Sequence, residues 1–164
     1  MLGKLETSAS ARRHQEVFAY WASLRRNGRL PSRAQLDPVQ LKRLLPTISL
    51  IDVVPHQAGH FFRQRLAGTG LYSVYGCEIT GRRLDEIYGE AEVSYWREQL
   101  NQVVETARPA VGCQPVASRS GSVSSLLWLR LPLASDGMTV DMILGFDVAL
   151  NAPASRMPSG IRAA

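Results

Sequence analysis

The sequence predicts an α+β fold, in which a five-stranded antiparallel sheet carries helices on one face and an N-terminal helical extension. Three observations lead to this prediction. Apolar residues recur at helical spacing in two long segments, five segments have strand character, and the last three strands follow one another through short turns. Strands joined by short turns pair antiparallel, and one helical crossover separates the first two strands from the last three.

Two long helices are predicted over residues 11–27 and 90–107. The apolar stripe of the first is formed by Val17, Phe18, Trp21 and Leu24, with arginines on the opposite face. The stripe of the second is formed by Val93, Trp96, Leu100, Val103, Val104 and Ala107. Asp37 and Pro38 have the pattern of a helix start, so we expect a third, shorter helix that ends by Pro46.

The strands are predicted from β-branched and alternating segments that are bounded by turn residues. They cover residues 47–54, 60–67, 110–118, 123–134 and 139–150. Turn residues occupy 56–59, 119–122 and 135–137, and the Asp136-Gly137 pair is a strong hairpin signal. Within 61–84 a strand gives way to a short helical pattern at 71–75, interrupted by Gly68 and Gly76. This arrangement predicts the wall of a pocket.

Size and charge define three regions. A chain of 164 residues with 45% apolar and 20% charged residues fits one globular domain. Residues 1–33 carry seven basic and two acidic side chains, which is the whole net charge of +5. We therefore expect a basic amphipathic helix and linker over 1–36, a globular domain over 37–150 and a flexible tail over 151–164. No signal peptide or metal-binding cysteine spacing is visible, so a cytoplasmic protein with reduced thiols is expected.

Several sequence strings resemble a family of short bacterial proteins that contain a single PAS domain. The strings are WASLRRNGRLPSRAQLDP, LLPTISLIDVV, FRQRLAGTGL and YGCEITGRRL. The most specific parts are residues 65–69 and the Thr80-Gly81 pair, whereas Gln64 stands where an aromatic residue is usual. The resemblance covers about residues 18–146. It implies a PAS fold and a sensory or signalling module that is usually dimeric and that binds a small molecule, a signalling protein or both.

Signatures of cofactors and catalysis are missing from the sequence. Neither Cys77 nor Cys113 lies in the G-x-N-C-R-F-L-Q type of string of flavin-binding PAS domains, and residues 90–107 contain no histidine for haem. P-loop, G-x-S-x-G and H-E-x-x-H motifs are also missing. We therefore predict no enzyme and neither flavin nor haem, and we leave an unidentified small ligand open. A small-molecule enzyme ranks last among the alternatives.

Alternation along the last two strands predicts which residues surround a ligand pocket. Leu127, Leu129, Leu131 and Leu133 share one strand face with Met142, Leu144 and Phe146 of the next strand. We expect this leucine-rich set to face the helices. The predicted pocket residues are Gln64, Phe62, Leu66, Tyr72, Tyr75, Leu129, Met142 and Leu144. Gln64 contacts either a ligand or a nearby backbone group.

The opposite sheet face carries Trp128 and Ile143 and needs a cover. The apolar stripe of the first helix is the best candidate, supplied by the same chain or by a second copy. The predicted dimer or partner surface is therefore Phe18, Trp21, Leu24, Trp128 and Ile143. A homodimer and an unidentified signalling protein are the expected partners.

Basic residues leave two further alternatives open. The N-terminal arginines could contact nucleic acid or an anionic membrane, or they could form an ordinary solvated helix face. Arg82 and Arg83 could hold a phosphate or be a solvated pair. Arg65 is expected to pair with a carboxylate, either Asp52 or Asp85.

Overall fold

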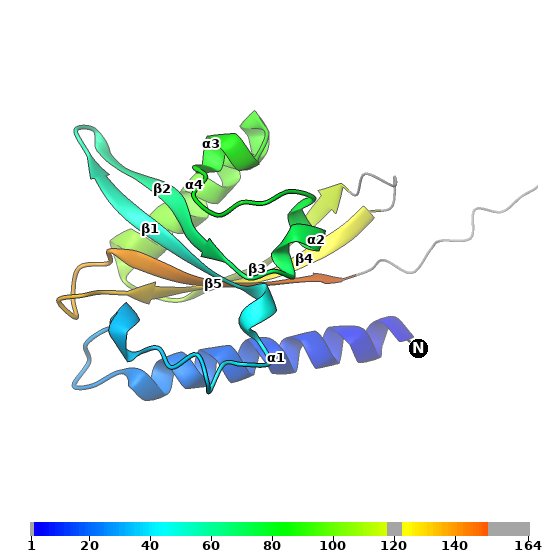
Figure 1. The fold of residues 1–164 in the computed structure, drawn as a ribbon, viewed down its shortest axis with the longest axis horizontal. Helices are drawn as coiled ribbons and strands as arrows, with labels where there is room; N and C mark the ends of the chain where they lie inside the picture. Colours follow the sequence, from blue (N-terminus) through cyan, green and yellow to red (C-terminus); the bar gives the residue numbers. More distant parts are fainter. Residues whose placement is uncertain (1, 118–122, 151–164) are drawn as a thin grey trace, which may run out of the picture.

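The computed structural model describes residues 2–117 and 123–150 of the 164-residue chain. Figure 1 shows one sheet with helices above and below it. The helical elements are α1 (Leu2–Leu24), η1 (Arg33–Gln35), η2 (Leu45–Thr47), α2 (Leu71–Tyr75), α3 (Leu84–Ile87) and α4 (Glu90–Thr106). The strands are β1 (Ile48–His56), β2 (Gly59–Ala67), β3 (Ala110–Ala117), β4 (Val123–Leu133) and β5 (Met142–Leu150).

All neighbouring strands of the sheet are antiparallel, and their order is β2-β1-β5-β4-β3. The hairpin β1–β2 forms one side and the meander β3–β4–β5 forms the other. The segment α2–α3–α4 connects the β2 edge to the β3 edge of the sheet. It is the helical crossover that the sequence predicts. The expected five-stranded α+β architecture is confirmed.

Helices cover both faces of the sheet. We call the face under α1 the outer face, and the face under α2, α3 and α4 the inner face (Figure 1). On the outer face, α1 packs against β4 and β5 of its own chain. On the inner face, α4 packs against β3 and β4, and α2 against β5. The N-terminal helix is therefore an integral layer of the fold rather than a projecting arm.

Polar contacts as well as apolar burial fix α1 on the outer face. Val17 and Trp21 are buried, and the Trp21 indole Nε1–H donates to the carbonyl oxygen of Pro132 over 2.9 Å. The ring nitrogens of His14 lie 2.8 Å from the Ser10 carbonyl oxygen and 3.1 Å from that of Leu127. The Trp21 hydrogen bond and the His14 ring between two carbonyls determine where the helix lies along the strands.

The predicted assignment of the two sheet faces is wrong. The leucine-rich set lies on the outer face under α1, where Phe146 packs edge-on against the His14 ring. Trp128, on the inner face, packs against Trp96 of α4. Alternation shows which residues share a face, but both faces of this sheet are apolar enough to be covered. Alternation alone therefore could not tell which helix covers which face.

A β-bulge at Arg65 reverses the alternation of β2. Ile51 pairs with Gln64 and Leu50 pairs with Leu66, so the intervening residue has no partner on β1. One extra residue moves every following side chain to the other face. Leu66 therefore lies on the outer face, 42% exposed, instead of beside Gln64 as predicted.

Several element boundaries differ from the prediction: α1 ends at Leu24 rather than at residue 27, and β5 begins at Met142 rather than at residue 139. The N-terminal helix begins at Leu2 rather than at residue 11. Residues 38–44 form consecutive turns followed by η2 instead of the helix expected from Asp37. The stretch is held largely by turn hydrogen bonds between residues three apart, from Lys42 N–H to the Val39 carbonyl and from Leu44 N–H to the Leu41 carbonyl. The predicted turn 119–122 and tail 151–164 lie outside the described residues.

Candidate functional site

A cavity of about 140 Å³ lies between α2, α4 and the inner face of the sheet. We call it the inner cavity. Its walls mix aromatic, aliphatic and polar side chains: Val74, Tyr75, Ile87, Tyr88, Glu92, Trp96, Gln114 and Leu126. The short helix α2 supplies two of these residues. A ligand that enters the cavity therefore contacts a helix of only five residues.

A buried ion pair lies beside this cavity. Arg130 Nη1 is 2.7 Å from Asp147 Oδ1, and Nη2 is 3.3 Å from Oδ2. Both residues are 1% exposed. Tyr75 of α2 donates its hydroxyl to Asp147 Oδ2 over 3.0 Å. One carboxylate on β5 therefore connects β4, β5 and α2.

Burial and the ion pair keep these groups in defined protonation states. Burial works to lower the pKa of Arg130, but the nearby Asp147 carboxylate outweighs it, so the pKa is raised. Burial, reinforced by the charge of Asp147, raises the pKa of Tyr75 well above its ordinary value. Burial likewise raises the pKa of Tyr88. At neutral pH the Tyr75 hydroxyl therefore keeps its proton and donates it in a hydrogen bond to the Asp147 carboxylate.

Aromatic rings fill the space around the pair. Tyr88 stacks on Trp96 with ring centroids 5.8 Å apart, and Trp96 meets Trp128 edge-on at 5.4 Å. The Arg130 guanidinium lies 4.7 Å from the centre of the Trp96 ring. Gly112 makes room for Trp128, since a Cβ there would overlap the indole. These side chains pack against one another between α4 and the sheet.

Four buried polar atoms have no hydrogen-bond partner among the described residues. They are Ser49 Oγ, Gln64 Oε1, Gln114 Oε1 and Arg130 Nε. Such an atom costs about 1–3 kcal/mol when nothing satisfies it. Gln114 also lines the inner cavity, so its amide oxygen is available to a donor group inside it.

The structure separates the predicted pocket residues into three groups. Tyr75 lines the inner cavity, and Phe62 and Gln64 are buried on the same sheet face. Tyr72 is 59% exposed. The remaining residues lie on the outer face: Leu66, Leu129, Met142 and Leu144. The face reversal and the bulge explain these four corrections.

Sequence reasoning missed the residues that form most of the cavity and the ion pair. Tyr88 directly follows α3, Trp96 lies on α4 and Gln114 lies on β3, and these segments meet only in the folded chain. A signal for Arg130 and Asp147 was present, because two opposite charges lie on one face of otherwise apolar strands.

The predicted dimer surface also needs correction. Trp21, Trp128 and Ile143 are at most 2% exposed within one copy, so they present no surface to a partner in this fold. Leu24 is half-buried. Phe18 remains 44% exposed on α1, next to the Trp21 ring.

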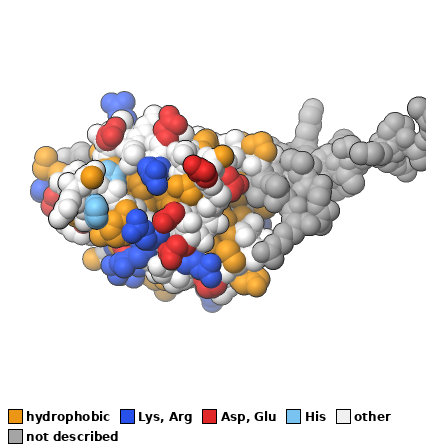
Figure 2. Space-filling model, turned by 90° about the horizontal axis from the view of Figure 1, so that it is seen from above, with side chains coloured by type: hydrophobic (Ala, Val, Ile, Leu, Met, Phe, Trp, Pro, Cys, Tyr) orange, Lys and Arg blue, Asp and Glu red, His pale blue; other side chains and the backbone are white. Residues whose placement is uncertain are grey.

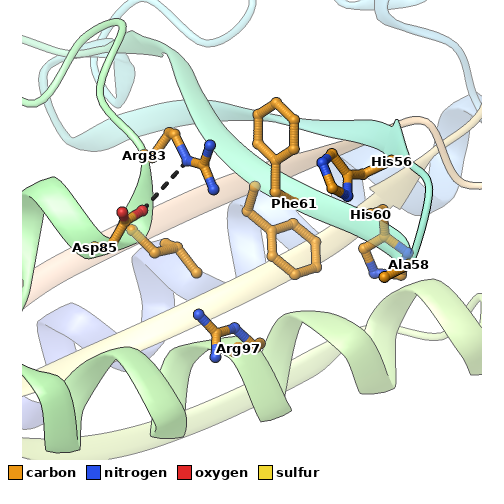
Figure 3. Close-up of a pocket in the computed structure, with 9 residues that line it drawn as sticks. His56, Ala58, His60, Phe61, Arg83, Asp85 and Arg97 are labelled. Carbon is orange, nitrogen blue, oxygen red and sulfur yellow. Dashed lines mark ion pairs between the residues drawn. The ribbon is translucent and has the colours of Figure 1, made fainter.

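A second hollow of about 220 Å³ lies between the hairpin β1–β2, the start of α3, and α4 (Figure 3). We call it the hairpin cleft. It is lined by His56, Ala58, His60, Phe61, Phe62, Arg83, Leu84, Asp85 and Arg97. Viewed from above, histidines and basic side chains lie near one another toward one end of the molecule (Figure 2).

A third hollow, of about 290 Å³, lies on the outer face. Leu36, Leu41, Leu45, Leu50, Leu66 and Leu144 contribute to its largely apolar lining. Among the described residues, no three His, Cys, Asp or Glu side chains are close enough to hold a metal ion. None of the described helices is long and apolar enough to span a membrane.

A sequence profile described as "PAS domain" matches residues 9–148, which is most of the chain. The chain belongs to the PAS domain family. The match includes α1 from residue 9, all five strands and the inner cavity. PAS domains are generally sensory modules, and they commonly form dimers and signal to partners. No curated protein matches the sequence.

Similar solved structures include PAS and light-oxygen-voltage (LOV) domains. A LOV domain studied with a flavin analogue is 15% identical, with a TM-score of 0.50, over 68% of this chain and 82% of that one. A PAS domain from Colwellia psychrerythraea is 12% identical, with a TM-score of 0.46, over 69% and 96%. The LOV domain of the Erythrobacter litoralis EL346 histidine kinase is 13% identical, with a TM-score of 0.48, over 64% and 95%. The first of these supports the fold alone.

The inner cavity of this PAS domain does not fit a flavin. Its volume of about 140 Å³ is well below the roughly 300–1,000 Å³ of pockets that enclose drug-sized ligands. Trp96, Trp128 and the Arg130–Asp147 pair occupy the space between α4 and the sheet. A ligand of the inner cavity therefore has to be much smaller than a flavin.

The most specific family residues serve the fold. Arg65 Nε lies 2.7 Å from Asp52 Oδ1, which confirms one of the two pairings predicted for it, and Arg63 contacts the other oxygen of the same carboxylate at 3.1 Å. Gly68 passes so close to the backbone of Leu45 and Pro46 that a Cβ would overlap their carbonyl oxygens. These residues position the end of β2 and the start of α2.

Proposed function

We propose that this PAS domain is a sensory and signalling module that binds a small molecule in the inner cavity. The observation that carries the proposal is the contact of Tyr75 with the buried Asp147 carboxylate, at the point where α2 borders the cavity. A ligand that displaces Tyr75, or that hydrogen-bonds to Gln114, shifts the balance between two arrangements of α2. Binding is thereby converted into a change of surface shape.

The helix α2 is suited to such a response. It contains five residues, which is too short for an independently stable helix, so tertiary contacts hold it in place. Leu71 is completely buried at its start, and Tyr75 is held by Asp147 at its end. The outward-facing side chain of Tyr72 is 59% exposed and is available to report a movement to a partner.

We further propose that the module forms a homodimer through the exposed side of α1. Phe18 supports this proposal because it is a large apolar residue, 44% exposed, on a helix that is rigidly packed on its own sheet. PAS domains commonly dimerise. The proposed contact places two α1 helices between two sheets. A cytoplasmic location is also proposed, since Cys77 and Cys113 are free thiols.

Native mass spectrometry of the full chain purified from its own host tests both parts of the function. We expect the mass of a dimer with a small retained ligand. Gln114→Leu should lose the ligand and keep the dimer, whereas Gln102→Leu, an exposed change on α4, should keep both. A wild-type chain without added mass would contradict ligand binding in the inner cavity.

The dimer is tested separately by Phe18→Glu, which places a charge on the proposed contact. Light scattering after size exclusion should show a monomer, because burying an unpaired charge opposes association. Val39→Glu is the matched control, since Val39 is an apolar residue outside α1 that is 78% exposed. A Phe18→Glu dimer as stable as wild type would contradict the α1 interface.

The basic residues of α1 favour one alternative function, an adaptor for nucleic acid or an anionic membrane. Arg12 and Arg13 remain exposed, as do Arg25 and Arg26 beyond the buried Trp21. Binding to DNA, RNA or anionic vesicles that weakens with salt and is lost when these four arginines are changed to Gln would support it.

A further inference from the structure

The hairpin cleft has features of an anion-binding site. It shares no lining residue with the inner cavity, and it meets α4 at Arg97 instead of at Glu92 and Trp96. Arg83 and Arg97 enter the cleft from opposite sides, Arg83 from the segment before α3 and Arg97 from α4 (Figure 3). The two histidines come from the hairpin, and the Nε2 of His60 is already bonded to Asn101. The two arginines are therefore the donors that the cleft offers to a ligand.

The charges in the cleft are not balanced by its own carboxylate. Asp85 is the single acidic residue among its lining residues, and its Oδ1 lies 3.3 Å from Arg83 Nε. Arg97 forms no ion pair within 2–117 and 123–150. Both side chains of the Arg83–Asp85 pair are more than half exposed, so water weakens that pair. The lining side chains therefore carry one excess positive charge even with neutral histidines, and the Glu86 carboxylate beside the cleft accepts the Arg83 backbone N–H.

Two side chains of the cleft, Arg83 and His60, are held in place before any ligand arrives. The Arg83 guanidinium lies 4.4 Å from the centre of the Phe61 ring, a cation–π contact that restricts its side chain. His60 Nε2 lies 2.8 Å from Asn101 Oδ1 of α4, and its ring packs edge-on against Phe62. A site that is ordered beforehand loses less entropy on binding.

The floor of the cleft is apolar. Phe62 and Leu84 are 3% and 6% exposed, and they lie beneath the charged residues. An ion pair next to such a surface is stronger than one in open water, because the local dielectric is lower. The volume of about 220 Å³ corresponds to roughly seven water molecules, enough for a small metabolite.

We propose that the hairpin cleft binds a small oxyanion, the phosphate or carboxylate group of a metabolite, between Arg83 and Arg97. The guanidinium groups each present a planar fork of N–H donors that matches either oxyanion. This site is additional to the inner cavity and does not depend on the function proposed above.

The proposal is tested by titrating the ¹⁵N-labelled full chain with inorganic phosphate and, separately, with succinate. Ionic strength is held constant with sodium chloride. We expect saturable shifts of backbone amide signals in 56–62, 83–85 and 97–101. Saturation by phosphate alone identifies a phosphate site, saturation by succinate alone a carboxylate site, and saturation by both a general oxyanion site. Each of the three supports the proposal.

Neighbouring arginines provide matched variants. Arg83→Gln and Arg97→Gln should each weaken binding at least about tenfold, the effect of losing one charge-assisted hydrogen bond. Arg82→Gln removes the same charge one residue away from the cleft lining and should change affinity less than about twofold. Arg97→Lys keeps the charge but loses the fork, and an intermediate affinity is expected.

Three results would overturn the proposal. They are the lack of saturable shifts with both anions, equal weakening by Arg82→Gln and Arg83→Gln, and shifts confined to the inner-cavity residues. Amide spectra of the free variants that match the wild type establish that the exposed substitutions leave the fold intact.

Discussion

Tyr75 at the end of α2 donates its hydroxyl hydrogen to Asp147 of β5 over 3.0 Å, across 72 residues of sequence. The acceptor is at the same time the partner of Arg130. The position of a helix of one turn is thus connected to the only ion pair that is buried on both sides among the described residues. Whatever displaces Tyr75 also changes the environment of that pair.

Tyr75→Phe removes this contact with little change in shape. A hydrogen bond to a charged group contributes about 1.5–3 kcal/mol, so the free energy of unfolding should fall by about that amount. Amide hydrogen exchange in 71–76 should accelerate more than exchange in β5. Tyr72→Phe, on an exposed residue of the same helix, should leave both quantities unchanged. Uniform acceleration across the domain would contradict a local role for Tyr75.

Alkaline stability should depend on the same hydroxyl. The pKa of Tyr75 in the folded chain is raised, so its stabilising effect is complete below the ordinary tyrosine pKa of about 10 and is lost as the pH rises above it. Urea unfolding between pH 8 and 11 should show a steeper loss for wild type than for Tyr75→Phe. Tyr72→Phe should lose stability with pH as the wild type does. An equal pH dependence of stability for Tyr75→Phe and wild type would contradict a buried phenol at Tyr75.

Breaking the buried ion pair should be more costly than replacing it. Asp147→Asn leaves the Arg130 charge without its partner, and the expected loss is about 3–5 kcal/mol in urea unfolding. A double variant, Arg130→Met with Asp147→Leu, removes both charges and should recover most of that loss. Arg63→Gln is the control, because its pair with Asp52 is exposed on the arginine side. A double variant less stable than Asp147→Asn would show that the charges themselves stabilise the fold.

The attachment of α1 should weaken in acid. Burial lowers the pKa of His14, while the Ser10 and Leu127 carbonyls partly oppose the shift. A lowered pKa means that the stabilising effect of neutral His14 is present above about pH 6.5 and is lost as the pH falls through the folded value. Hydrogen exchange in α1 should therefore accelerate from pH 7.5 to 5, after correction for the intrinsic rate. His14→Gln should reduce this acceleration, whereas His56→Gln on the exposed hairpin should not.

Gly112 should tolerate no side chain. Its Cβ would overlap the Trp128 indole, which is buried between Tyr95 and Trp96. Gly112→Ala should lower the free energy of unfolding by about 1–3 kcal/mol and shift the tryptophan fluorescence. Gly89→Ser is the control, because no atom lies within 4 Å of its Cβ and serine suits the start of α4. Equal stability of the two variants would contradict the close packing at Trp128.

The order of elements could be predicted from the sequence because it depends on local patterns. The apolar stripe of 90–107 and the Asp136-Gly137 turn each determine their own structure. The pairing of Arg65 with Asp52 was one of two alternatives, and the fold selected it by placing β1 next to β2.

The inner cavity could not be predicted in the same way, because it depends on relations between distant segments. One unpaired residue at Arg65 reverses the faces of β2, and no local pattern marks it. The face that α1 covers depends on partners such as Pro132 and Leu127 for Trp21 and His14. These contacts join residues more than 100 positions apart.

The cis packing of α1 has a consequence for any protein that recognises the leucines of β4 and β5. Such a protein has to compete with a helix that is joined covalently to β1 through residues 25–47, at a local concentration of the order of millimolar. A competitor present at micromolar concentration needs about 1,000-fold higher affinity to displace α1 from half of the molecules. The helix therefore acts as an intramolecular competitor that sets an affinity threshold for access to this face.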